Sequence, residues 1–312
     1  MWLFLSMSGL FFEVPNSIDL GVFIDNYIHN VQKVDKRLDE YIKDPNKDNI
    51  HDIRTAIRRL EASYSASPKQ IRRKRMKKYV DGSKHLFKLN SEIRDFDIIL
   101  EKLNKEGQMD EQQLGILSKS IKRQKNRKLD KALSLAIELR KLNATPLNND
   151  NDLYDRCIVQ QKLIKRYNNV VGKFVCRMER NFPIVINNGE RIDELHEIRK
   201  DSKKLRYLLE LVLSNKDRNK GNIDKNDVIN KNDHGDNHNV SFLLEKLEKI
   251  QDMLGNIHDY DITTAYLKGH NSHNFFIAEN NIAMIRKNKY EQFVQYCKSD
   301  LLDTENNSFI RT

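Results

Sequence analysis

Two histidines in this chain are each followed by basic residues at the spacing of one helical face. The first copy reads HDIRTAIRRL from His51, and the second reads HEIRKDSKKL from His196. Arg54 and Arg58 stand three and seven positions after the first histidine, which places all three side chains on one side of a helix. Like charges at this spacing repel one another. A bound polyanion would offset the repulsion, because phosphate oxygens accept charge-assisted hydrogen bonds from guanidinium, ammonium and imidazolium groups.

The second copy repeats the pattern with different cations. Arg199 and Lys203 take the places of Arg54 and Arg58, and Arg206 extends the row, where the first copy has Glu61. In both copies an apolar stripe runs beside the basic row, so each helix is expected to bury one side and to hold its cations at the edge of the core. A solvated charged face is the plainer interpretation of such a row. The repetition of a histidine and its cations at the same offsets favours a binding site.

An acidic element follows each basic row. It reads RDFD at 94–97 in the first copy and HDYD at 258–261 in the second. The two aspartates of each copy flank an aromatic residue. Two roles are open for these carboxylates, and the sequence does not favour either. One carboxylate of each pair orients a basic side chain for ligand binding, or the carboxylates form ordinary salt bridges on the helix surface.

A metal-dependent phosphohydrolase of the HD type is the enzymatic alternative. Its dyad would be either His51 with Asp52 or His258 with Asp259. The residue that matches His258 in the first copy is Arg94, and a guanidinium does not coordinate a cation. The repeat therefore favours anion binding, and we expect no catalytic residues, no metal and no cofactor.

Further basic residues surround the two rows. Lysine and arginine together number 55 against 45 acidic residues, a net charge of +10, and such a surface attracts polyanions in general. RNA or another nucleic acid stays open as a ligand, especially at low salt, although no helix-turn-helix or zinc-finger spacing occurs. Residues that would line the same cavity or strengthen its field are Lys77, Lys84, Lys88, Lys122, Lys165 and Arg166.

The elements that position these residues are expected to be helices throughout. Glycine and proline number only 11 and 5, and apolar residues recur at helical spacing between breaks that delimit roughly eight helices. The internal duplication divides the chain into two similar halves of about four helices each, 19–145 and 146–312. A polar, asparagine-rich run at about 215–239 is predicted to be a disordered insertion in the second half. Residues 1–18 are predicted to be an N-terminal tail or arm.

The cysteines and the apolar start bear on the compartment. Cys157, Cys176 and Cys297 show no metal-binding spacing and leave one thiol unpaired in any disulfide scheme, as expected for buried thiols in the cytoplasm. The first twelve residues are apolar but too short to span a bilayer and lack the cationic start of a signal peptide. We expect neither secretion nor a membrane partner.

The two motifs, H-x-x-R-x-x-x-(R/K)-(R/K)-L and (R/H)-D-(F/Y)-D, each present twice and in the same order, resemble those of the CHAD family, the conserved histidine α-helical domain. The resemblance covers about residues 19–302. It implies two four-helix bundles related by a pseudo-twofold axis, with a central basic channel or groove that binds inorganic polyphosphate, often at polyphosphate granules. The ligand residues it implies are His51, Arg54, Arg58, Arg59, His196, Arg199, Lys203, Lys204 and Arg206, with Arg94 and His258 as further candidates.

One feature often found with this family is absent. Its members are frequently fused to a triphosphatase domain that carries an ExExK signature, and this sequence has no such signature. The resemblance therefore implies binding of polyphosphate and not hydrolysis of a triphosphate.

Overall fold

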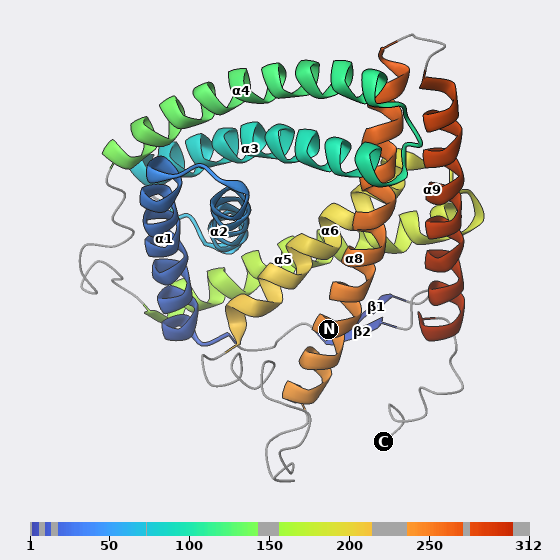
Figure 1. Ribbon diagram of the computed structural model, residues 1–312. Helices are drawn as coiled ribbons and strands as arrows, with labels where there is room; N and C mark the ends of the chain where they lie inside the picture. The colour runs from blue at the N-terminus through green and yellow to red at the C-terminus, as the bar shows by residue number, and fades with distance from the viewer. Residues whose placement is uncertain are drawn as a thin grey trace, which may run out of the picture.

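Long helices make up most of the structure, a computed structural model that describes residues 2–5, 10–13, 18–72, 74–142, 156–213, 236–270 and 275–301 (Figure 1). The described residues form eight α-helices, which confirms the predicted helical class. Their bounds are α1 Leu20–Lys43, α2 Lys47–Ala66, α3 Lys74–Glu106, α4 Glu111–Lys141, α5 Arg156–Asn187, α6 Ile192–Val212, α8 Asp236–Lys268 and α9 Phe276–Tyr296. A short π-helix, η3 Cys297–Leu301, continues α9.

Side-chain caps fix where several helices begin. Asp19 accepts a hydrogen bond from the backbone N–H of Val22 at the start of α1, and Asp110 accepts one from Gln113 at the start of α4. Asn46 caps α2 by accepting from Asp48 and Asn49. Short polar side chains are favoured here because they satisfy N–H groups that have no partner inside the helix.

Four helices meet in the middle of the molecule. α2 packs against α3 and α6, and α8 packs against α3 and α6 in turn, so each of the four contacts two of the others. Antiparallel neighbours flank them, with α1 beside α2, α4 beside α3, α5 beside α6 and α9 beside α8 (Figure 1). The two histidine motifs lie on α2 and α6, and the two acidic elements lie on α3 and α8. The packing therefore brings all four motifs together.

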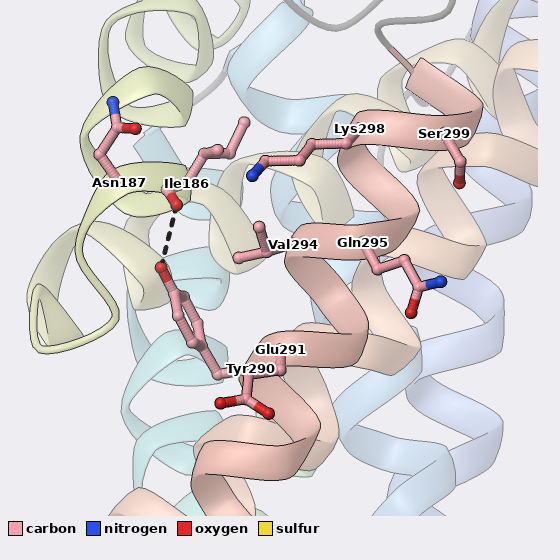
Figure 2. Close-up of a pocket in the computed structure, with 8 residues that line it drawn as sticks. All are labelled: Ile186, Asn187, Tyr290, Glu291, Val294, Gln295, Lys298 and Ser299. Carbon is pink, nitrogen blue, oxygen red and sulfur yellow. Dashed lines mark hydrogen bonds between the residues drawn. The ribbon is translucent and has the colours of Figure 1, made fainter.

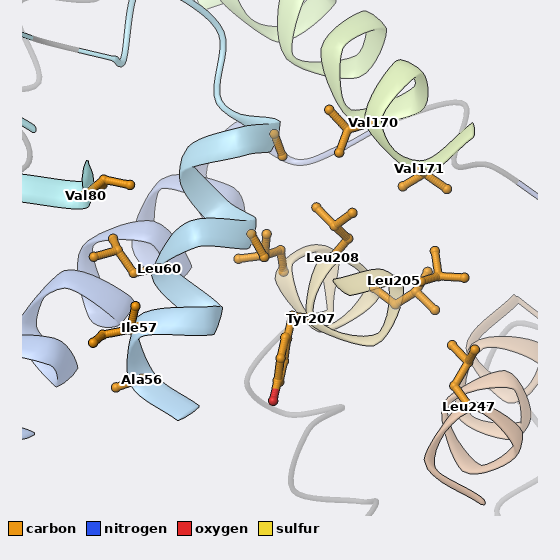
Figure 3. Close-up of a cluster of buried hydrophobic side chains, with 14 of the residues drawn as sticks. Ala56, Ile57, Leu60, Val80, Val170, Val171, Leu205, Tyr207, Leu208 and Leu247 are labelled. Atoms are coloured by element: carbon orange, nitrogen blue, oxygen red, sulfur yellow. The ribbon is translucent and has the colours of Figure 1, made fainter. Parts of the chain in front are cut away.

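The core runs through both halves of the chain. One large cluster of buried apolar side chains includes residues from all eight helices, and a smaller cluster joins the ends of α3, α4, α8 and α9. Figure 3 shows part of the large cluster, where Leu205 and Leu208 of α6 lie on the side of that helix that faces Val170 and Val171 of α5. Burial of such side chains is the main stabilising contribution of the helix contacts.

The structure adds a small hairpin to the predicted helices. Within the predicted arm 1–18, strands β1 Trp2–Leu5 and β2 Leu10–Glu13 pair antiparallel, and they contact α5 and α8 respectively. The predicted disordered insertion at 215–239 lies outside the described residues as far as 235, and α8 begins at Asp236. The pseudo-twofold relation between 19–145 and 146–312 stays a prediction. Within the described ranges, no helix has the length and apolar character needed to cross a bilayer.

Candidate functional site

The two histidine helices are held in a fixed rotation by their apolar stripes. On α2 the stripe is buried, and on α6 the matching stripe is buried as well, as both were predicted to be. Its members are Ile50, Ile53, Ile57 and Leu60 on α2 and Leu195, Ile198 and Leu205 on α6. Because these side chains pack into the core, the rotation of each helix about its axis is fixed. The basic row beside each apolar stripe therefore lies where α2 and α6 meet each other and their neighbours.

Five basic side chains from three helices gather at this contact, and they are here called the cation cluster: Arg54, Arg58, Arg94, Arg199 and Lys203. Burial lowers the pKa of Arg54 to about 10, and repulsion from Arg58, Arg199 and Arg94 contributes to the shift. The same causes, burial first and then Arg58, lower the pKa of Arg199. The electrostatic contact between Arg54 and Arg199 joins the two histidine rows in space, although 145 positions separate them in sequence.

Lys203 is the most strongly affected member of the cluster. Burial lowers its pKa to about 6, and repulsion from Arg199, Arg58 and Arg54 adds to the effect. An amine with such a pKa is largely uncharged at neutral pH in the empty site. A bound anion would reverse this balance, because it stabilises the ammonium form.

Several polar atoms in and beside the cluster have no hydrogen-bond partner within the described chain. The buried, unpartnered nitrogens are Nε of Arg54, Nη1 of Arg94, Nε of Arg199, Nε of Arg206 and Nδ1 of His196. Buried polar groups in proteins are nearly always hydrogen-bonded, and leaving one unpaired costs roughly 1–3 kcal/mol. Unpaired guanidinium donors that meet from α2, α3 and α6 are suited to bind an anion with several oxygens.

Two of the histidines lie against each other beside the cluster. The ring centroids of His196 and His258 are 4.5 Å apart and the rings are tilted by 39°. Burial, followed by repulsion from Lys200 and Arg199, lowers the pKa of His196 to about 4. Burial and repulsion from Arg199 lower the pKa of His258 to about 3. The third histidine, His51, is the first residue of the α2 row and is exposed, yet it is partly desolvated, and this partial burial, followed by repulsion from Arg54, lowers its pKa.

The first aspartate of each acidic element faces the cation cluster. Burial raises the pKa of Asp95 to about 6, although the nearby Arg54 and Arg199 act in the opposite direction. Burial also raises the pKa of Asp259, against the opposing effect of Arg199. These two carboxylates therefore offset part of the positive charge of the cluster.

The second aspartate of each element holds a cation from the next helix. Asp97 of α3 accepts a 2.5 Å hydrogen bond from Lys125 Nζ of α4, and Asp261 of α8 accepts a 2.8 Å bond from Arg286 Nε of α9. In both copies this aspartate therefore forms a salt bridge between neighbouring helices, the plainer of the two roles considered, and a role in orienting a ligand-binding cation stays a prediction. The partners Lys125 and Arg286 tie neighbouring helices together and are not members of the cation cluster.

An aromatic side chain that the sequence analysis did not select supports the α2 row. The guanidinium carbons of Arg58 and Arg54 lie 4.8 Å and 5.6 Å from the ring centroid of Phe87 on α3. Cation–π contacts of this kind orient a guanidinium without occupying its hydrogen-bond donors. Phe87 lies on the helix that carries Arg94, but its place in the sequence gave no signal of this role.

Other predicted ligand residues have partners of their own. Arg59 and Arg206 form ion pairs with Glu210, and Arg206 also pairs with Glu248. Lys204 lies over the ring of Phe174 at 5.5 Å, and Arg166 donates to the backbone carbonyl of Ser65. Arg59 and Arg206 therefore differ from the cation cluster, whose members have no ion pair within the described ranges. Lys204 and Arg166 have no ion pair there either, but each has another partner. The remaining predicted lysines are exposed, and their part in binding stays a prediction; they are Lys77, Lys84, Lys88, Lys122 and Lys165.

Two surface hollows lie away from the cluster. The larger, about 690 Å³, opens between the end of α5 and the α9–η3 segment, where Tyr290 donates a 3.1 Å hydrogen bond to the carbonyl of Ile186 (Figure 2). The second, about 470 Å³, follows α4 and is lined by Lys119, Arg123 and Arg127 among others. Neither hollow contains a residue of the cation cluster, so the predicted basic channel is not identified with either.

Metal ligation has little support in the described part of the chain. No group of three or more histidine, cysteine, aspartate or glutamate side chains comes together there. His258, a candidate for the enzymatic dyad, is surrounded by Arg199, Lys203 and Lys200 as well as His196. Such surroundings repel a cation and attract an anion.

Comparison with known proteins gives two findings. A family model described as the CHAD domain matches residues 27–219. The crystal structure of the CHAD domain from the plant Ricinus communis is similar in fold, with a TM-score of 0.51 and 14% sequence identity over 95% of this chain and 92% of that chain. No curated protein matches the chain.

Proposed function

The chain belongs to the CHAD family, and we propose that it binds inorganic polyphosphate through the cation cluster of α2, α3 and α6 together with His196 and His258. The observation that carries the proposal is the meeting of unpartnered, buried guanidinium nitrogens from Arg54, Arg94 and Arg199. Their mutual repulsion destabilises the empty site. A flexible chain of phosphates offsets it, because each phosphate replaces its counterions with fixed protein donors.

We propose binding without catalysis. The candidate dyads place their histidines among cations, which suits an anionic ligand and opposes a divalent metal. Membership of the CHAD family supports polyphosphate as the polyanion. We propose a cytoplasmic protein that is found at polyphosphate granules where its ligand concentrates. RNA is the competing ligand, since a net charge of +10 attracts any phosphate polymer.

A competition experiment tests the proposal. Long-chain polyphosphate is titrated against the whole protein at two salt concentrations, with and without single-stranded RNA. We expect affinity for polyphosphate to fall steeply as salt rises. We also expect polyphosphate to displace RNA at a far lower phosphate concentration than RNA needs to displace polyphosphate. Equal displacement at equal phosphate concentration would show a general polyanion binder and refute the proposed specificity.

A further inference from the structure

The basic row of α6 ends in a carboxylate. Counted from His196, the residues at offsets of 3, 7, 10 and 14 are Arg199, Lys203, Arg206 and Glu210. At 100° per residue all five side chains fall within an arc of roughly 80° on one face of the helix. The cationic face of α6 therefore changes sign at its C-terminal end, after Arg206.

Glu210 holds the two arginines at this end. Its Oε2 atom accepts a 3.1 Å hydrogen bond from Arg59 Nε of α2, and its Oε1 atom lies 3.6 Å from Arg206 Nε, an ion pair without a hydrogen bond. The three side chains are between 20% and 30% exposed, so water screens these pairs less than pairs at an open surface. Arg206 Nη1 additionally donates a 2.8 Å bond to Glu248 of α8.

The site thus has an open end and a neutralised end. Arg54, Arg58, Arg199 and Lys203 have no ion pair within the described ranges, whereas Arg59 and Arg206 share theirs with two glutamates. The open part of the α6 row runs from His196 to Lys203, a rise of roughly 10 Å along the helix axis at about 1.5 Å per residue. A phosphate chain that follows the row beyond Lys203 reaches arginines whose charge is already compensated.

We propose that Glu210 is a specificity-determining residue that limits how many phosphates the site accepts. This inference rests on the proposed polyphosphate function. A short phosphate chain occupies the open end and never reaches Glu210. A longer chain must displace the carboxylate from Arg59 and Arg206 or leave the row, and it gains little from its additional units.

The test compares two ligands on Glu210→Gln, which keeps the shape of the side chain and removes its charge. Tripolyphosphate and long-chain polyphosphate are titrated by calorimetry into the wild-type protein and the variant. We expect the variant to bind the long chain roughly 5- to 10-fold more tightly, the scale of one charge-assisted hydrogen bond. Affinity for tripolyphosphate should change less than about twofold, because the short chain does not reach Glu210 and is affected only by the change in the general electrostatic field.

Two further variants make the result decisive. Glu291→Gln on α9, where the side chain is 60% exposed, changes the net charge equally and should leave both affinities unchanged. Glu248→Gln, with a 61% exposed side chain, should fold whether or not Glu210→Gln does, and it should raise long-chain affinity by a smaller factor.

Each outcome has one meaning. If Glu210→Gln raises the affinity for both ligands equally, the limit set by Glu210 is refuted while polyphosphate binding stands. The same holds if neither Glu210→Gln nor Glu248→Gln alters the ratio of the two affinities. If the wild-type protein binds neither ligand, the proposed function fails, and this inference fails with it.

Discussion

His196 and His258 have pKa values of about 4 and 3, well below that of an ordinary histidine, and Lys203 has one of about 6. Burial among cations is the shared cause. All three groups are therefore mostly uncharged in the ligand-free protein above pH 7. A bound phosphate stabilises their protonated forms and raises all three pKa values, so binding is coupled to proton uptake.

The sign of the pH dependence follows from these lowered values. As pH falls from 8 to 5, the complex binds protons that the free protein does not, so affinity should increase, by at most about tenfold per pH unit for each proton taken up. Calorimetry in buffers of different ionisation enthalpy measures the uptake directly. The His258→Gln variant should take up fewer protons than the wild-type protein when polyphosphate binds. Affinity that is independent of pH, or that rises toward alkaline pH, would contradict the assigned role of these groups.

At the scale of single helices, much of the arrangement was predictable and some of it was not. The periodic apolar stripes predicted the helices and their buried faces, because burial fixes helix rotation independently of the partner. The ion pairs of Glu210 were not predicted, although it stands four residues after Arg206 on the same face. Its pairing with Arg59 depends on how α2 crosses α6, which local periodicity does not determine.

The acidic elements also have partners that depend on helix packing and that local periodicity does not predict. The sequence left two roles open for these carboxylates, orienting a ligand-binding cation or forming a plain salt bridge, and Asp97 and Asp261 form salt bridges. It did not identify the partners Lys125 and Arg286, because they lie on the following helices, at 28 and 25 positions along the chain. Only the packing of α4 on α3 and of α9 on α8 selects them.

In the second acidic element, Asp259 faces the cation cluster and Asp261 joins α8 to α9, and this difference leads to a prediction for the α8–α9 pair. Asp261 and Arg286 are nearly buried, 10% and 11% exposed, and loss of one partner of such a pair costs about 3–5 kcal/mol. Asp261→Ala should therefore lower the free energy of unfolding by about this amount, measured by urea denaturation. Polyphosphate affinity of the folded variant should be unchanged. Weaker binding with unchanged stability would instead assign Asp261 to the ligand site.

At the scale of the whole molecule, four motifs that are distant in sequence converge because α2, α3, α6 and α8 pack together. The internal duplication indicated which residues belong together, and the electrostatic contact of Arg54 with Arg199 is consistent with it. The N-terminal hairpin was not predicted, since two four-residue strands carry little periodic signal. The net charge of +10 acts over the entire surface, so it attracts polyanions without selecting a site.

The central claim is that the cation cluster, rather than the net charge of the whole surface, determines where polyphosphate binds. Arg54→Ala with Arg199→Ala removes two guanidinium groups whose buried Nε atoms have no hydrogen-bond partner, and Arg123→Ala with Arg127→Ala removes two exposed ones from the surface hollow along α4. The two double variants therefore lose the same charge and the same kind of side chain. Circular dichroism and thermal melting establish that both are folded before any titration.

The measurement is the dissociation constant for long-chain polyphosphate of both double variants and the wild-type protein at one moderate salt concentration. The cluster variant should bind more than about 10-fold more weakly, since a hydrogen bond to a charged group contributes about 1.5–3 kcal/mol. The α4 variant should stay within about threefold of wild type, because it changes only the general field. Unaltered affinity in the folded cluster variant, or an equal loss in both variants, would contradict the assignment of the site.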